Sequence, residues 1–230
     1  MNTVRPPIAL LGSLCLLQAA TGVNWSVFFA FGGFFLAAKL GFSLEEVALL
    51  VSSSFLVYCI VQFGASLVVD AGVRLVGLRA MLLRSPIFYG LGMTLVVVGP
   101  DSASVVIGSG LAGLGAATLP LMLAAVADHT PKHLSSRMAS LLGVAYLMGQ
   151  IVALGAGWLL VNDAKARSAF VGLSAMWAVV AAILLLTLRL GPTINPEPAP
   201  VSSAFAAQIR TSFGTVWRLL GEPRTRALKF

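Results

Sequence analysis

Residues 102–161 read SASVVIGSGLAGLGAATLPLMLAAVADHTPKHLSSRMASLLGVAYLMGQIVALGAGWLLV, and this stretch decides the fold. Two uncharged apolar runs, Ser102–Val126 and Met138–Val161, flank a short loop. Each run matches the roughly 20 residues that cross the hydrocarbon core of a bilayer. The loop, Asp128–Arg137, places two cationic side chains and two histidines around Pro131, which is typical of a cytoplasmic edge. The stretch therefore predicts two antiparallel membrane helices.

The composition agrees with a bilayer as the solvent of this protein. The 230 residues are 58% hydrophobic and only 10% charged, whereas soluble domains carry roughly 25% charged residues. The net charge of +7 lies mostly in loops and in the tail. It therefore indicates orientation in a membrane, and we expect no nucleic-acid partner.

The cysteines and histidines predict no disulfide, metal site or other cofactor. Cys15 and Cys59 both lie inside apolar runs, where thiols are usually inert. His129 and His133 are four residues apart, but Pro131 separates them, so a solvated loop is favoured over a metal site. No phosphate-binding loop or other catalytic motif is present, so we do not expect an enzyme. A cleaved signal peptide at Arg5–Ala20 is the alternative to a first membrane helix, but the apolar run continues to Ala38.

The same kind of apolar run recurs through residues 1–190, and helices are favoured because a backbone in lipid must satisfy its own hydrogen bonds. The sequence thus predicts an all-α membrane protein with six transmembrane helices: Ile8–Leu36, Val47–Val69, Met81–Val98, Ser102–Val126, Met138–Val161 and Ala169–Leu188. We expect glycine breaks in the first helix at Gly22, Gly32 and Gly33. We also expect a tight charged turn at Asp70–Arg79 and a kink near Pro86. No charged side chain is expected in the middle of a span, although the third span is entered through Arg84.

The basic residues predict the topology. With a cytoplasmic N-terminus, 12 of the 15 Lys and Arg residues face inward, and only Lys39, Lys165 and Arg167 face outward. The opposite orientation inverts this ratio, so the positive-inside rule favours both termini in the cytoplasm. The predicted location is the plasma (inner) membrane.

Residues 191–230 form a second region with a different composition. A proline-rich linker, Gly191–Pro200, precedes apolar residues at helical spacing: Phe205, Ile209, Phe213, Val216 and Leu220. With Arg210 and Arg218 on the opposite face, this segment is a basic amphipathic helix. It either lies on the anionic cytoplasmic leaflet or covers the cytoplasmic face of the protein itself.

Three short motifs carry a resemblance to a transporter family. Asp70 and Arg74 match a charged signature between spans two and three, without its first glycine and first arginine. Gly113, Gly115, Ala116 and Ala117 match the small-residue part of a span-four motif, in which Ser109 and Ala112 replace an arginine and a glutamine. The glycines of span five resemble an antiporter motif but lack its Gly-Pro pair, because Gln150 follows Gly149. With six spans and a long basic tail, the chain resembles the N-terminal half of a major facilitator superfamily transporter.

This resemblance implies transport of a small solute by alternating access, with a second six-helix half or a second copy as the partner. The tail resembles the lead-in to a missing seventh span. The alternatives are a non-transporting membrane scaffold or assembly factor with the same fold, and a truncated, inactive fragment. Without a mid-span carboxylate, we expect no proton relay within this half.

The resemblance also points to functional residues. Spans one, two, four and five approach the central cavity of the family, which makes the following residues candidate solute contacts: Gln18, Asn24, Trp25, Tyr58, Tyr146 and Gln150. The alternative for each polar residue, and for Gln62 and Thr118, is a hydrogen bond between helices. A cytoplasmic charge cluster that favours one conformation is predicted from five residues: Asp70, Arg74, Arg79, Asp128 and Arg137.

Overall fold

The computed structural model describes residues 8–155, 157, 163–187 and 210, and these residues form an all-helical protein. The elements in chain order are α1 (Ile8–Ser26), the π-helical turn η1 (Val27–Phe31), α2 (Gly32–Leu40), α3 (Leu44–Leu67), α4 (Val69–Val98), α5 (Ser102–Ala116), α6 (Leu119–His129), α7 (Lys132–Gly155) and α8 (Asp163–Thr187). The predicted second region, 191–230, lies outside the described residues, except for the helical and exposed Arg210.

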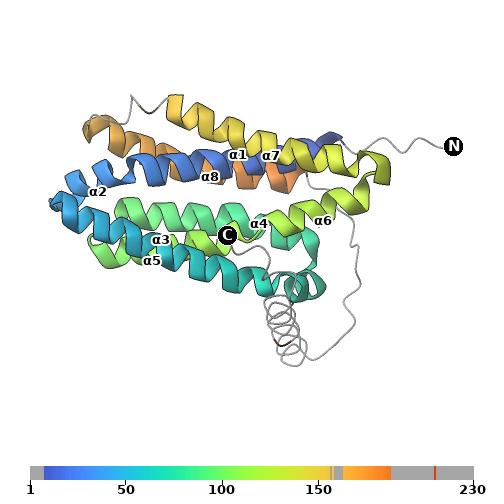
Figure 1. The fold of residues 1–230 in the computed structure, drawn as a ribbon, viewed down its shortest axis with the longest axis horizontal. Helices are drawn as coiled ribbons and strands as arrows, with labels where there is room; N and C mark the ends of the chain where they lie inside the picture. The colour runs from blue at the N-terminus through green and yellow to red at the C-terminus, as the bar shows by residue number, and fades with distance from the viewer. Residues whose placement is uncertain (1–7, 156, 158–162, 188–209, 211–230) are drawn as a thin grey trace, which may run out of the picture.

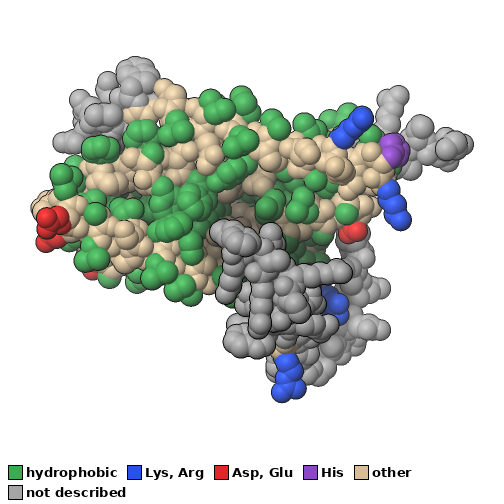
Figure 2. Space-filling view, viewed as in Figure 1, with side chains coloured by type: hydrophobic (Ala, Val, Ile, Leu, Met, Phe, Trp, Pro, Cys, Tyr) green, Lys and Arg blue, Asp and Glu red, His purple; other side chains and the backbone are tan. Residues whose placement is uncertain are grey.

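Six helical segments of the described chain are long and apolar enough to cross a membrane, which confirms the predicted number of spans. Spans 1 to 6 are Ile8–Leu40, Leu44–Leu67, Val69–Val98, Ser102–His129, Lys132–Gly155 and Ser168–Thr187. Figure 2 shows apolar side chains over the flank of the bundle and charged side chains gathered at its two ends. A bilayer would cover such an apolar flank, which includes the exposed Leu49, Ile60 and Ile151.

The spans form two layers that lie side by side in Figure 1. One layer holds α1, α7 and α8, and the other holds α3, α4 and α5. The contact between α4 and α8 joins the two layers. Large side chains fill this contact, where the rings of Tyr89 and Trp177 stack with centroids 4.4 Å apart.

The packing repeats within the bundle. Span 1 packs on spans 5 and 6, and span 4 packs on spans 2 and 3. If span 1 is matched with span 4, span 2 with span 5 and span 3 with span 6, each of these contacts has a counterpart in the other half of the bundle. The six spans therefore form two three-helix repeats, an organisation that transporter folds also use.

The first span of each repeat is interrupted. Span 1 is interrupted by the wider turn η1, where the helix was expected to break at Gly22, Gly32 and Gly33. Gly22 instead lies within the regular helix α1, and the interruption ends just before Gly32. Span 4 breaks between Ala116 and Leu119, where the Thr118 amide donates to the Ala116 carbonyl oxygen at 2.8 Å. Each interruption frees backbone groups that a regular helix would pair.

The prediction of a tight turn over Asp70–Arg79 was wrong. The segment is helical within α4, and its one non-helical residue is Gly77, with φ 82° and ψ 158°. Glycine adopts this positive φ without the steric penalty of a Cβ atom, so the helix changes direction there. Pro86 lies inside α4 with helical φ and ψ, and the kink near it stays a prediction.

Arg84, through which the third span was expected to be entered, is hydrogen-bonded to a neighbouring span. Its side chain is half-buried within α4, and Nη2 donates to the carbonyl oxygen of Ala117 at 2.9 Å. Ala117 directly follows α5, so its carbonyl is one of those released by the break in span 4. Arg84 thus replaces a lost helical hydrogen bond and holds spans 3 and 4 together.

Glycines allow the helices within each layer to approach closely. A Cβ added to Gly22 of α1 would collide with the Tyr146 carbonyl oxygen of α7, and one at Gly149 would collide with the Ala19 carbonyl oxygen. Gly92 and Gly108 provide the same close approach between α4 and α5. Small residues at such contacts are a common basis of helix association in lipid.

Short connections join the helix ends. Ser43 and Glu46 form a reciprocal capping box at the start of α3. Asp101 caps α5, and hydrogen bonds from the side chain and amide of Ser104 lower the pKa of its carboxyl group. Thr130 and Pro131 separate α6 from α7, so His129 and His133 lie on different helices.

We predict that Gly22→Ala destabilises the bundle. The added methyl group meets the backbone of α7, and overpacking of this kind costs about 1–3 kcal/mol. Thermal unfolding in detergent measures the effect. Gly12→Ala on the same helix is the matched control, because nothing lies within 4 Å of its added Cβ. Equal midpoints for the two variants would contradict the close contact.

We also predict that Arg84→Met loosens span 4 at its break. The substitution keeps a long apolar stem but removes the donor to Ala117, so deuterium uptake over residues 117–129 should rise. Arg79→Met is the control, since Arg79 donates to the Leu185 carbonyl oxygen at 2.8 Å. That variant should raise uptake only near the end of α8. Unchanged uptake over 117–129 in Arg84→Met would refute the role of Arg84.

Candidate functional site

A cavity of about 480 Å³ opens along the face where the two layers meet. Its lining residues are Gln18, Thr21, Trp25, Tyr58, Gln62, Tyr89, Ala116, Thr118, Leu119, Leu123, Ala139, Gly143 and Tyr146. Spans 1 to 5 all contribute, and both interrupted spans are among them. In membrane transporters, interrupted helices at corresponding positions of two repeats indicate a binding site.

A hydrogen-bonded chain of aromatic side chains forms one wall. The indole Nε1 of Trp25 donates to the Tyr58 hydroxyl oxygen at 3.1 Å, and the Tyr58 and Tyr89 hydroxyls lie 3.0 Å apart. Phe55 packs edge-on against Trp25, with ring centroids 5.6 Å apart, and Phe29 packs edge-on against Tyr58. The wall therefore combines apolar ring edges with fixed polar atoms.

Two buried polar side chains of the cavity have no hydrogen-bond partner among the described residues. The Gln18 side chain on α1 is 7% exposed, and the Thr118 side chain at the span 4 break is 2% exposed. Neither side chain makes a hydrogen bond within residues 8–155, 157, 163–187 and 210. The polar atoms of Gln18 and Thr118 are not among the fully buried atoms without a partner, so they are open to the cavity and available to a bound molecule.

Of the other candidate residues on spans 1 and 5, some line the cavity and others contact neighbouring side chains outside it. Tyr146 lines the cavity, and Gln150 lies behind it, with Nε2 donating to the Tyr146 hydroxyl at 3.2 Å. Asn24 lies away from the cavity, because its Oδ1 accepts from Nε1 of Trp177 at 2.9 Å inside the contact between α1 and α8. Of the adjacent candidates Asn24 and Trp25, Asn24 is thus placed as a helix–helix contact, whereas Trp25 lines the cavity.

The cavity is uncharged among the described residues. None of its lining side chains is Asp, Glu, Lys, Arg or His. The described residues also contain no group of three potential metal ligands. Binding in this part of the cavity must therefore rely on hydrogen bonds and on aromatic surface.

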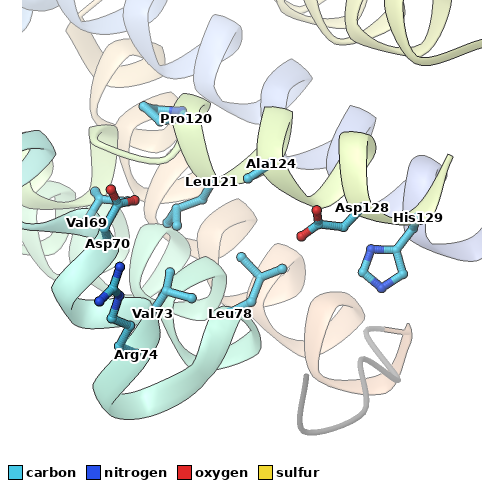
Figure 3. Close-up of a pocket in the computed structure, with 10 residues that line it drawn as sticks. All are labelled: Val69, Asp70, Val73, Arg74, Leu78, Pro120, Leu121, Ala124, Asp128 and His129. Carbon is cyan, nitrogen blue, oxygen red and sulfur yellow. The ribbon is translucent and has the colours of Figure 1, made fainter. Parts of the chain in front are cut away.

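Three of the predicted charge-cluster residues lie together in a second pocket, of about 460 Å³. Figure 3 shows Asp70 and Arg74 at the start of α4, facing Asp128 near the end of α6. His129 completes the charged or titratable part of the lining. The structure does not bring the other two residues to this pocket: Arg79 contacts α8, and Arg137 is exposed on α7.

Helix α6 separates the two pockets. Leu119 and Leu123 face the uncharged cavity, whereas Pro120, Leu121 and Ala124 line the charged pocket. Because α6 begins at the break in span 4, it is a short segment that contacts both sites. A displacement of α6 would change both pockets at once.

Sequence reasoning identified part of this site. Tyr89 was missed because the resemblance pointed to spans 1, 2, 4 and 5, and Tyr89 belongs to span 3. Gln62 and Thr118 were recognised as polar residues but not selected as contacts. The position of Thr118 directly before Leu119-Pro120 was a usable signal, because proline marks the first turn of a new helix.

Comparison with known proteins agrees with this geometry. The family model of the Major Facilitator Superfamily matches residues 14–228. A comparison with curated proteins returns no match. The family model covers nearly the whole chain, and the six spans, the internal repeat and the central cavity fit the fold that the resemblance implied. The chain therefore belongs to the major facilitator superfamily.

Proposed function

We propose that this chain moves a small solute across the membrane by alternating access and supplies one half of the translocation pathway. Membership of the family supports membrane transport. The observation that carries the proposal is the cavity, in which polar groups without partners among the described residues lie beside an aromatic wall. Polar atoms that are open to the cavity and unpaired within the described residues are available to a solute, and a non-transporting scaffold would have no need of them.

The proposed solute contacts are Gln18, Trp25, Tyr58 and Tyr146, which all line the cavity. Asn24 and Gln150 have a different proposed role. Asn24 fixes α1 against α8, and Gln150 orients the Tyr146 hydroxyl. Both act by positioning groups of the site.

The proposed partner is a second six-helix half or a second copy of this chain. The described residues supply six candidate spans, which in this family form one wall of the central cavity. Spans 2 and 5, which border the cavity, are the least buried of the six. Parallel pairing of two halves would cover these spans and enclose the polar groups.

The proposed orientation places both termini in the cytoplasm of a cell with a plasma (inner) membrane. Arg74, Lys132 and Arg137 lie at the end of the bundle that holds the α6–α7 connection, whereas Glu45 and Glu46 lie at the opposite end. The positive-inside rule assigns the first end to the cytoplasm.

A flux and mass measurement tests the proposed function. The purified chain is reconstituted in liposomes, and uptake from a mixture of labelled sugars, nucleosides, amides and organic acids is followed by mass spectrometry. Gly143→Trp should abolish uptake, because Gly143 lines the cavity and has open space around it. Gly12→Trp places the same bulk on an exposed surface of α1 and should retain uptake.

The mass of the solubilised protein then shows whether uptake requires two halves or a single chain. Uptake by a dimer, or only with an added second half, is the expected result. Saturable uptake by a strict monomer would refute the half-transporter proposal. A folded dimer without any uptake would favour the scaffold.

The charged pocket generates a prediction about conformation. Arg74 lines the same pocket as Asp70 and Asp128, so Arg74→Gln removes a positive charge from a pocket with two carboxylates and should separate α6 from the start of α4. Labelling of a cysteine placed at Ala124, which lines this pocket, should then become faster. Arg137→Gln removes the same charge outside the pocket and should have no effect. Equally faster labelling in both variants would mean that these charges only orient the protein in the membrane.

A further inference from the structure

Assuming the proposed transport function, we infer that this half of the site selects an uncharged solute whose oxygen atoms accept hydrogen bonds from the hydroxyls of Tyr58 and Tyr146. Carbonyl, ether and hydroxyl oxygens on a small ring compound fit this chemistry. The inference rests on the direction of the hydrogen bonds behind each tyrosine and on the absence of charge from the described lining.

The hydrogen bonds at Tyr58 leave its proton available. The indole N–H of Trp25 is a donor only, so the Tyr58 oxygen must accept from it. Tyr89 is 0% exposed, and Tyr58 is its one hydrogen-bond partner in the described part of the chain. Tyr89 therefore satisfies its buried O–H by donating to Tyr58. With both lone pairs of its oxygen engaged, Tyr58 directs its own proton into the cavity.

Tyr146 is oriented in the same way from the opposite layer. Gln150 lies one turn further along α7, and its amide nitrogen donates to the Tyr146 oxygen at 3.2 Å. The Tyr146 hydroxyl then donates its own proton elsewhere, and the cavity is the space it lines. The N–H groups of Trp25 and Gln150 thus leave the hydroxyl protons of Tyr58 and Tyr146 free to donate into the same cavity.

Gln18 adds a group that both donates and accepts. Its side chain is nine-tenths buried, lines the cavity and makes no hydrogen bond to the described residues. A solute hydroxyl or amide would pair with it. A solute with acceptor oxygens for the tyrosines and one further polar group for Gln18 would satisfy all three side chains.

The lack of charge decides against ionic solutes. A carboxylate or an ammonium group in the cavity would lose its hydration without meeting an opposite charge on the described lining. An ammonium group would in addition face two O–H donors. The ring edges of Trp25 and its neighbours instead suit the apolar side of a neutral ring.

Two matched series of probes test the inference on the reconstituted full chain. The first is nicotinamide, nicotinate and 3-picolylamine, and the second is D-glucose, D-glucuronate and D-glucosamine. Each series keeps the ring and changes the charge from neutral to anionic to cationic. Titration calorimetry should show that the neutral member of at least one series binds at least about tenfold more tightly than both of its charged relatives. Tyr58→Phe and Tyr146→Phe should each weaken that binding about fivefold, the effect of one lost hydrogen bond.

Ser140→Ala is the control, because Ser140 lies on the exposed side of α7 and bonds only to the Ser136 carbonyl oxygen. It should leave binding unchanged. Tighter binding of a charged member, equal binding within both series, or binding that both Tyr→Phe variants leave unchanged would overturn the inference. So would a lack of binding by all six compounds to protein that takes up another solute in liposomes, a result that leaves the proposed transport function intact.

Discussion

The structure depends on the pairing of every backbone polar group within the bilayer. Unbroken helices meet this requirement by themselves, but spans 1 and 4 are interrupted and release backbone groups inside the membrane. At the break in span 4, Arg84 donates to the freed Ala117 carbonyl oxygen. A charged side chain is thus placed inside a span because a neighbouring helix lacks a hydrogen bond. This hydrogen bond pairs a carbonyl that the interruption releases.

The same break links the two pockets. It makes α6 a separate short helix, one side of which borders the uncharged cavity and the other the charged pocket. Asp70, Arg74 and Asp128 line a pocket that is bounded by the segment that also carries the cavity residues Leu119 and Leu123. A two-state arrangement of α6 would let a charge contact at one end of the bundle favour one shape of the cavity. No long-range pathway is needed, because a single helix touches both sites.

Most of the fold was predictable from the sequence, because uncharged runs of membrane length determine the spans and the basic loops indicate their direction. The local errors have one cause: the identity of a residue does not reveal its neighbours. The direction of span 3 changes at Gly77, where the backbone has a positive φ. Gly22 looked like a breaker, but its lack of a side chain serves the contact with α7. Arg84 looked like a span-end charge, and its carbonyl partner lies 33 residues away.

For the polar residues of the site, the sequence alone could not distinguish a helix contact from a cavity contact, and the structure does. Polar side chains in apolar spans serve either helix contacts or a cavity, and the sequence offers both readings for each one. The structure separates them by their partners. Asn24 is paired with Trp177 between α1 and α8, so its polarity is used within the bundle. Gln18, on the same helix, is as deeply buried but has no partner among the described residues. An amide that lines the cavity and is unpaired within the described residues is available to a solute, which makes Gln18 the stronger candidate for contact with one.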